Sequence, residues 1–218
     1  MPKLNEMKYF TILLMFILTG CVGKKKNDSL PFYNTPDFTP VWLTPTDAAY
    51  PAIHTIAPFN LTNQLGNAIT NQQTKGKIYV ANFFFASCGS ICPKMMGNLA
   101  DVQQAFKNDD RVLLISHSVT PTRDSVPVLL KYAADNHIDN KKWWLLTGNK
   151  DAIYTLARKA YFADEQTGYN KASNEFLHTE NVVLIDQHGR IRGVYNGTLK
   201  LEMQNLIDHI KWLEGEKI

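Results

Sequence analysis

The chain has few cysteines and little net charge, and both shortages exclude classes of protein. Only three of its 218 residues are cysteine, so it is not a small domain held together by many disulfides. The formal net charge is +3, and no basic face with interleaved aromatic residues predicts nucleic-acid binding. Internal repeats are absent as well. The length suffices for a single α/β core.

The sequence also offers no comfortable membrane span, which takes about 20 apolar residues. Its N-terminal apolar run, Tyr9 to Leu18, is shorter, follows Lys3 and Lys8, and has the shape of a signal-peptide core. The run ends in Leu18 to Cys21, which looks like a bacterial lipoprotein cleavage box whose cysteine is acylated. We therefore expect a signal peptide over residues 1–20 and lipid on Cys21. A plain signal peptide or a short uncleaved anchor is the alternative; in each case the folded part is exported.

Residues 21–51 are expected to form the lipidated N-terminus and an extended tether. The stretch from Asn27 to Pro51 is rich in proline, threonine and aspartate, a composition typical of an extended segment. We expect this tether to pack on the folded part, residues 52–218, through four aromatic side chains: Phe32, Tyr33, Phe38 and Trp42.

Cys88 and Cys92 lie where a hydrophobic strand, Ile78 to Phe85, runs into a helix-like stretch that contains Pro93. A helix N-terminus favours the thiolate, which is the form that attacks disulfides and binds soft metals. Two residues four apart on a regular helix are roughly 5–6 Å apart, whereas disulfide Cβ atoms are about 3.5–4.5 Å apart. The spacing therefore predicts Cys88 in the loop and Cys92 in the first turn, where the pair closes as a disulfide or opens to hold a metal.

Strands and helices alternate along the rest of the chain, which indicates an α/β fold. The pattern is that of a thioredoxin-like three-layer sandwich with an added N-terminal β-hairpin and an insertion before the C-terminal hairpin. The predicted strands are Ile56 to Leu61, Ala68 to Thr70, Ile78 to Phe85, Val112 to Val119, Trp143 to Leu146, Asn181 to Asp186 and Ile191 to Tyr195. The predicted helices are Pro93 to Phe106, Val126 to Asn136, Asp151 to Tyr161 and Leu199 to Leu213, and the insertion is Ala163 to Leu177.

From roughly Ile56 to its C-terminus the chain resembles the Sco/SenC family of exported, membrane-tethered thioredoxin-like proteins. The combination of C-x-x-x-C with a histidine just before a late strand is specific, because ordinary thioredoxins have C-x-x-C and lack that histidine. The motifs in register are Gly76-Lys77, Phe85 to Pro93, Ser118 to Asp124, Trp144 to Gly148, Leu177 to Thr179, Leu184 to Ile191 and Tyr195 to Thr198.

The resemblance implies a copper metallochaperone that helps assemble the dinuclear copper centre of cytochrome c oxidase. Its copper ligands would be Cys88, Cys92 and His178, and its partner the copper-accepting subunit of that oxidase. Two thiolates and an imidazole suit copper(I), and also hold copper(II) with a further weak ligand. One departure stands out: Thr120 occupies the position of the family's usual aspartate in the Ser-x-Asp-Pro run.

Two other functions remain open on the same thiols. A membrane-tethered thiol-disulfide oxidoreductase that acts on a partner's cysteines needs only Cys88 and Cys92, with Cys88 as the attacking thiol. A thiol peroxidase usually has threonine or serine three positions before its cysteine, where this chain has Phe85 and Gly89; it ranks last.

Two methionines next to the thiols and one histidine in a predicted strand are expected to have structural roles. Met95 and Met96 fit core packing on the helix better than contact with copper. His117 lies within a predicted strand and is expected to be a core or strand-end residue.

The lipoprotein box yields the first prediction. Cys21→Ser should abolish lipid labelling and release or mislocalise the protein, because serine lacks the thiol that is acylated. Metabolic labelling with a radioactive fatty acid, followed by fractionation, measures both effects. Labelling that persists in the variant would contradict the proposed anchor.

Overall fold

The computed structural model describes residues 29–163 and 179–216. Within these residues no helix is both long and apolar enough to cross a bilayer. The strands are β1 (Phe32–Tyr33), β2 (Pro40–Val41), β3 (Asn60–Asn63), β4 (Ala68–Thr70), β5 (Ile78–Phe84), β6 (Val112–Ser118), β7 (Trp143–Thr147), β8 (Asn181–Ile185) and β9 (Ile191–Asn196). The helices are α2 (Asn71–Thr74), α3 (Ile91–Ala105), α4 (Val126–Asp135), α5 (Lys150–Thr155) and α6 (Lys200–Gly215), with a short 3₁₀ helix, Tyr50–Ala52, and a π-helix, Leu156–Ala160.

Strand β5 lies inside a seven-stranded sheet of order β4-β3-β7-β6-β5-β8-β9 within the described part of the chain. It pairs parallel with β6 and antiparallel with β8. All seven of its residues are buried, which fits its largely apolar sequence, because both faces of the strand are covered. The predicted N-terminal hairpin, β3–β4, joins the sheet by pairing of β3 with β7.

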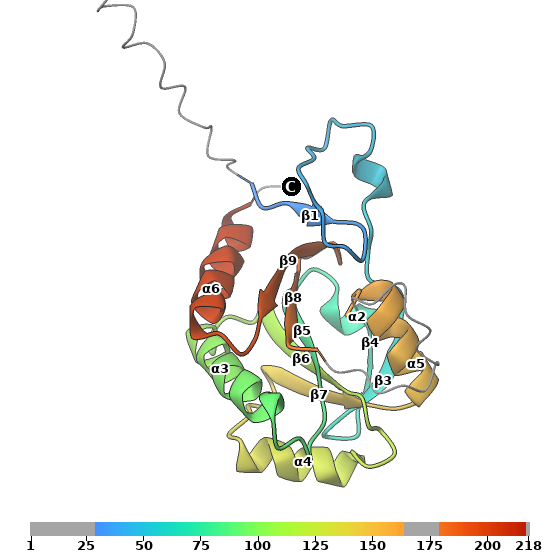
Figure 1. Ribbon diagram of the computed structural model, residues 1–218, viewed down its shortest axis with the longest axis vertical. Coiled ribbons are helices and arrows are strands. Elements are labelled where there is room, and N and C mark those ends of the chain that lie inside the picture. Colours follow the sequence, from blue (N-terminus) through green and yellow to red (C-terminus); the bar gives the residue numbers. More distant parts are fainter. Residues whose placement is uncertain (1–28, 164–178, 217–218) are drawn as a thin grey trace, which may run out of the picture.

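Helices cover both faces of this sheet and confirm the three-layer, thioredoxin-like architecture (Figure 1). Helices α3 and α6 lie side by side on one face, while α5 lies on the other (Figure 1). One core joins β5 to α3, α4 and α6 through side chains such as Phe84, Leu99 and Leu206. The second core includes Phe83, Ile115 and Ile153, from the opposite face of the strands and from α5.

Most predicted elements are confirmed to within a few residues, with two differences. The first strand of the hairpin begins at Asn60 rather than Ile56, because Ile56 instead donates its N–H to the Gly189 carbonyl in the β8–β9 turn. The predicted helix Asp151 to Tyr161 changes to a π-helix at Leu156. The predicted insertion, Ala163 to Leu177, lies almost wholly outside the described residues.

The described part of the expected tether, residues 29–51, is called the N-terminal arm. Arg192 of β9, whose side chain is fully buried, fixes this arm to the sheet. Its guanidinium donates to the carbonyl oxygens of Leu30 (2.8 Å) and Pro31 (3.2 Å), and to the Glu216 carboxylate (2.6 and 3.0 Å). It also lies 4.2 Å from the ring centroid of Phe32. A buried charge is tolerated only when its donors are satisfied, so one side chain joins both ends of the described chain.

Three of the four aromatic residues predicted to pack from the arm do so. Phe32 is buried, and Tyr33 and Phe38 pack against the second core. Trp42 is 47% exposed, so that prediction is wrong: the chain beyond β2 runs along the surface, and residues 44–49 are all exposed.

His117 of β6 is fully buried in an aromatic cage, as the prediction of a core position required. Its ring stacks on Phe83 with centroids 5.1 Å apart and lies 5.4 Å from Tyr161 and 6.2 Å from Phe59. Neither ring nitrogen has a hydrogen-bond partner among the described residues. Burial lowers the pKa of His117 from 6.5 to about 3, so the imidazole is neutral in the folded protein at neutral pH.

This cage predicts a loss of stability in mild acid. Between pH 6.5 and about 3 the unfolded chain binds a proton at His117 that the folded chain excludes, so the free energy of unfolding falls as pH falls. The residue should contribute a loss of about 2 kcal/mol between pH 7 and pH 5. His117→Phe, which stacks but does not titrate, should lack that contribution in urea unfolding at the two pH values.

The exposed His188 provides the matched control. His188→Gln should retain the wild-type difference between pH 7 and pH 5. Equal losses in the wild type and His117→Phe would show that the buried imidazole does not set the acid sensitivity.

Candidate functional site

The two thiols lie at the junction between β5 and α3, as the spacing predicts. Cys88 lies in the loop, and its N–H donates to the Phe85 carbonyl at 3.1 Å. Cys92 is the second residue of α3 and Pro93 the third. Proline suits this first turn because its missing N–H would have no partner within the helix.

Both thiols are free and mostly buried, with exposures of 9% for Cys88 and 4% for Cys92. They are close enough for the Cys92 thiol to donate a hydrogen bond to the Cys88 sulfur. Their loop neighbours Ser87, Gly89 and Ser90 are exposed. The pair therefore lies just beneath the surface, with Cys88 in an otherwise exposed loop.

Hydrogen bonds make the two thiols chemically unequal. Burial acts to raise the pKa of Cys88, but the hydrogen bond from Cys92 and the N–H groups of residues 90–92 outweigh it and lower the pKa overall. For Cys92, burial and its role as donor to Cys88 raise the pKa to about 12. Cys88 is therefore the thiol that more readily becomes a thiolate, in agreement with its predicted role as attacking group.

Tyr132 of α4 lies beside the pair, although sequence reasoning did not single it out. Burial, together with the nearby Cys92, Cys88 and Asp124, raises the pKa of its phenol to about 12. Its ring packs 5.4 Å from the ring of Phe84. Tyr132 is therefore a neutral wall of the site.

The two methionines of α3 are core residues, as expected. Met95 is fully buried and Met96 is 3% exposed. Their sulfur atoms accept weak hydrogen bonds from the side-chain amide of Asn82, at 3.9 and 3.8 Å. The two sulfur atoms that accept these bonds therefore face the sheet.

The predicted third ligand, His178, lies outside the described residues, as does Cys21. Among the described residues, no three His, Cys, Asp or Glu side chains gather as a metal site. The chain resumes at Thr179, just before β8, whose Val182 pairs with Asn82 of the antiparallel β5. Because β8 runs against β5, its first residues lie at the end of the sheet where β5 leads into the thiol loop.

The other histidines in the described residues have structural surroundings. The Nε2 atom of His54 lies 2.8 Å from the Ala160 carbonyl oxygen, and Nδ1 of His209 lies 2.7 Å from the Tyr195 hydroxyl. His137 follows α4 on the surface. His54 and His209 are therefore held by contacts within the fold.

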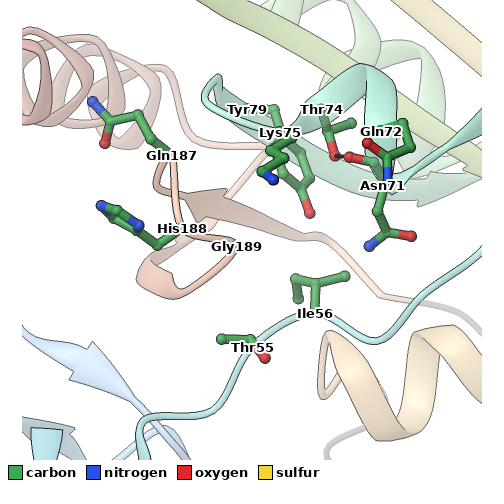
Figure 2. A pocket seen from close by; sticks show the side chains of 10 residues that line it. All are labelled: Thr55, Ile56, Asn71, Gln72, Thr74, Lys75, Tyr79, Gln187, His188 and Gly189. Carbon is green, nitrogen blue, oxygen red and sulfur yellow. Dashed lines mark hydrogen bonds between the residues drawn. The ribbon is translucent and has the colours of Figure 1, made fainter. Parts of the chain in front are cut away.

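A cavity of about 350 Å³ lies at the other end of β5, bordered by Tyr79, α2 and the β8–β9 turn (Figure 2). Figure 2 shows the side chains of Gln187 and His188 pointing away from Asn71 and Gln72 on the opposite wall. The cavity is thus separated from the thiols by the length of the strand.

The unequal thiols predict unequal reactivity. With limiting iodoacetamide near neutral pH, Cys88 should be alkylated about tenfold faster than Cys92 or more, because only the thiolate reacts. Peptide mass spectrometry measures both rates. Cys92→Ser, which keeps a donor for the Cys88 sulfur, should preserve the fast reaction, whereas Cys92→Ala should slow it. Faster labelling of Cys92 would contradict the assignment.

Known proteins share this fold and this sequence pattern. The SCO1 protein homolog of Bacillus subtilis (strain 168) is 28% identical over 163 residues, which cover 74% of this chain and 83% of that protein. The crystal structure of a SCO1/SenC family lipoprotein from Bacillus anthracis str. Ames is 28% identical, with a TM-score of 0.64 over 74% of this chain and 95% of that one.

A second solved structure is BsSco, described as a member of the Sco family of cytochrome c oxidase assembly proteins with a disulfide switch. It is 26% identical, with a TM-score of 0.63, and the match covers 76% of this chain and 96% of BsSco. The family model described as SCO1/SenC matches residues 47–214, a range that includes both thiols and every strand of the seven-stranded sheet. The chain therefore belongs to the SCO1/SenC family.

Proposed function

We propose that the protein is a copper metallochaperone for the dinuclear copper centre of cytochrome c oxidase. Its cargo would be one copper ion, carried by the Cys88 and Cys92 thiolates and the His178 imidazole. The observation that carries this proposal is a pair of free thiols, one in the loop before α3 and one in its first turn, in a chain of the SCO1/SenC family. The proposed partner is the copper-accepting subunit of the oxidase.

The chemistry of the pair suits copper(I) as cargo. Two thiolates are soft ligands that prefer copper(I) to hard divalent ions, and an added imidazole also accommodates copper(II). The Cys92 proton must leave on binding, because its pKa is raised to about 12. Apparent copper affinity should therefore increase as pH rises, since metal and proton compete for the same sulfur.

The path of the chain supports His178 as the third ligand. Thr179, its neighbour in sequence, lies at the end of the sheet where β5 enters the thiol loop. The Asn181 N–H donates to the Thr179 hydroxyl at 3.1 Å, and the Gly197 N–H donates to the Glu180 carbonyl at 2.8 Å. These contacts fix the chain immediately after position 178 at the thiol end.

A thiol-disulfide oxidoreductase is the second candidate, because two free thiols that lie close together are all that it needs. Cys88 would attack a partner disulfide, and Cys92 would then displace the partner's second thiol. Two electrons and two protons pass to the partner as the Cys88–Cys92 disulfide forms. BsSco is described as having a disulfide switch, and the two roles are compatible because a partner must be reduced before it accepts copper.

The location follows from the lipoprotein box. We propose that residues 1–20 are removed and that lipid on Cys21 anchors the protein to the bacterial cell membrane, facing the periplasm or the outside. Residues 21–51 would serve as tether and residues 52–218 as the carrier domain. A family relative is itself described as a lipoprotein.

Copper titration of the reduced, metal-free protein tests the main proposal. We expect about one copper(I) per chain. Removal of either thiol, in Cys88→Ser or Cys92→Ser, should weaken binding by about 100-fold or more, since losing a residue that only supports a ligand already costs 10–100-fold. His178→Ala should weaken copper binding and loosen the copper(II) form most, while disulfide exchange through the two cysteines stays largely intact.

The exposed His188 serves as a matched histidine control, because it lies in the β8–β9 turn at the far end of the sheet. His188→Ala should bind copper like the wild type. Unchanged binding in His178→Ala would remove that residue from the site. A reduced wild type that binds no copper would leave the oxidoreductase as the function.

A further inference from the structure

Asp124 is a buried carboxylate directly behind the thiol loop, in the connection between β6 and α4. It is 2% exposed. Its Oδ2 atom accepts three hydrogen bonds: from the Ala86 N–H at 3.1 Å, the Ser118 hydroxyl at 2.5 Å and the Thr120 hydroxyl at 3.0 Å. One oxygen therefore joins the loop that carries Cys88 to the end of the neighbouring strand.

Apart from the hydrogen bonds that the Cys88 sulfur receives from residues 90–92, few contacts order the loop. Residues Ser87, Gly89 and Ser90 are exposed, and the Ser90 side chain makes no capping hydrogen bond to α3. The Cys88 N–H bonds only to Phe85, within the same turn. The bond from Ala86 to Asp124, by contrast, spans 38 positions in sequence. A carboxylate oxygen is also a stronger acceptor than a backbone carbonyl oxygen.

We infer that Asp124 is a positioning residue: its carboxylate holds the Ala86 N–H and thereby fixes Cys88 against Cys92. This inference rests on the proposed function, since it concerns the same thiol pair. Asp124 does not itself join the cysteines in a three-ligand group. It acts through the backbone two residues before Cys88.

Thr120 helps to hold the Asp124 carboxylate in place. The family usually has aspartate at the position of Thr120. In this chain its hydroxyl donates to Asp124, as does the Ser118 hydroxyl. Both neighbours are neutral donors that orient the carboxylate, whereas a second carboxylate at that distance would repel it. The Asp124 oxygen is therefore oriented by two hydroxyl donors while it accepts the loop N–H.

Disulfide closure in glutathione buffers tests this role without copper. In that reaction, the Cys88 and Cys92 thiols give two electrons and two protons to glutathione disulfide, which becomes two glutathione thiols. Asp124→Ala should lower the equilibrium constant for closure about tenfold, which makes the pair about 30 mV less reducing. Hydrogen exchange at the Ala86 amide should accelerate by about tenfold or more, because that N–H loses its partner.

Matched variants separate positioning from general damage. Asp124→Asn keeps an oxygen that accepts the Ala86 N–H, so it should restore most of both properties. The surface variant Asp135→Ala should behave like the wild type. If Asp124→Ala fails to fold, Thr120→Val, which removes one of the donors that orient the carboxylate, should show the same changes in smaller degree.

Wild-type closure and wild-type Ala86 exchange in Asp124→Ala would overturn the inference. So would an Asp124→Asn variant that behaves like Asp124→Ala, since the accepting oxygen would then be irrelevant. Copper titration on the same samples keeps the two proposals apart. A wild type that binds no copper refutes the carrier function, while the loop measurements still decide the role of Asp124.

Discussion

The structure depends on the confinement of strand β5. Parallel pairing with β6 and antiparallel pairing with β8 satisfy its two edges, and helices cover its two faces. A strand held on all four sides cannot slide, because a shift of one residue would turn every side chain to the other face. The position of Phe84 is thus fixed by the whole core, and Cys88 follows four residues later. The position of the reactive loop is therefore set by a strand that takes no part in the chemistry.

Burial and hydrogen bonding divide the work between the two cysteines. Cys88 is held in the loop among donors, whereas Cys92 is part of the first helical turn and keeps its proton more strongly. An incoming metal or disulfide therefore meets one nucleophilic sulfur first, and the second sulfur responds once its proton has gone. This order of events suits a carrier that must both accept and release its cargo, because both the free and the loaded forms can be reversed.

Much of this arrangement was predictable from local patterns. The apolar run of β5, the thiol spacing and the family motifs predicted the strand, the loop and the helix start to within a few residues. Asp124 was not predicted as a structural contact, because its bond to Ala86 connects positions 38 apart and depends on tertiary packing. The exposure of Trp42 and the π-helix at Leu156 were not predicted for a similar reason. Composition and periodicity do not show which surface remains uncovered or how a helix end adjusts.

The contacts of Arg192 also determine at which end of the domain the N-terminal arm is attached. Arg192 follows Ile191, which pairs with Ile185, and Ile185 pairs with Tyr79 at the start of β5. The arm thus joins the domain at one end of the central strand and the thiols lie beyond the other, a separation of about 20 Å or more. Figure 1 shows β1 and α4 at opposite extremes of the fold. If lipid on Cys21 holds the domain by its arm, as proposed, the thiols would lie on the side of the domain that faces away from the bilayer.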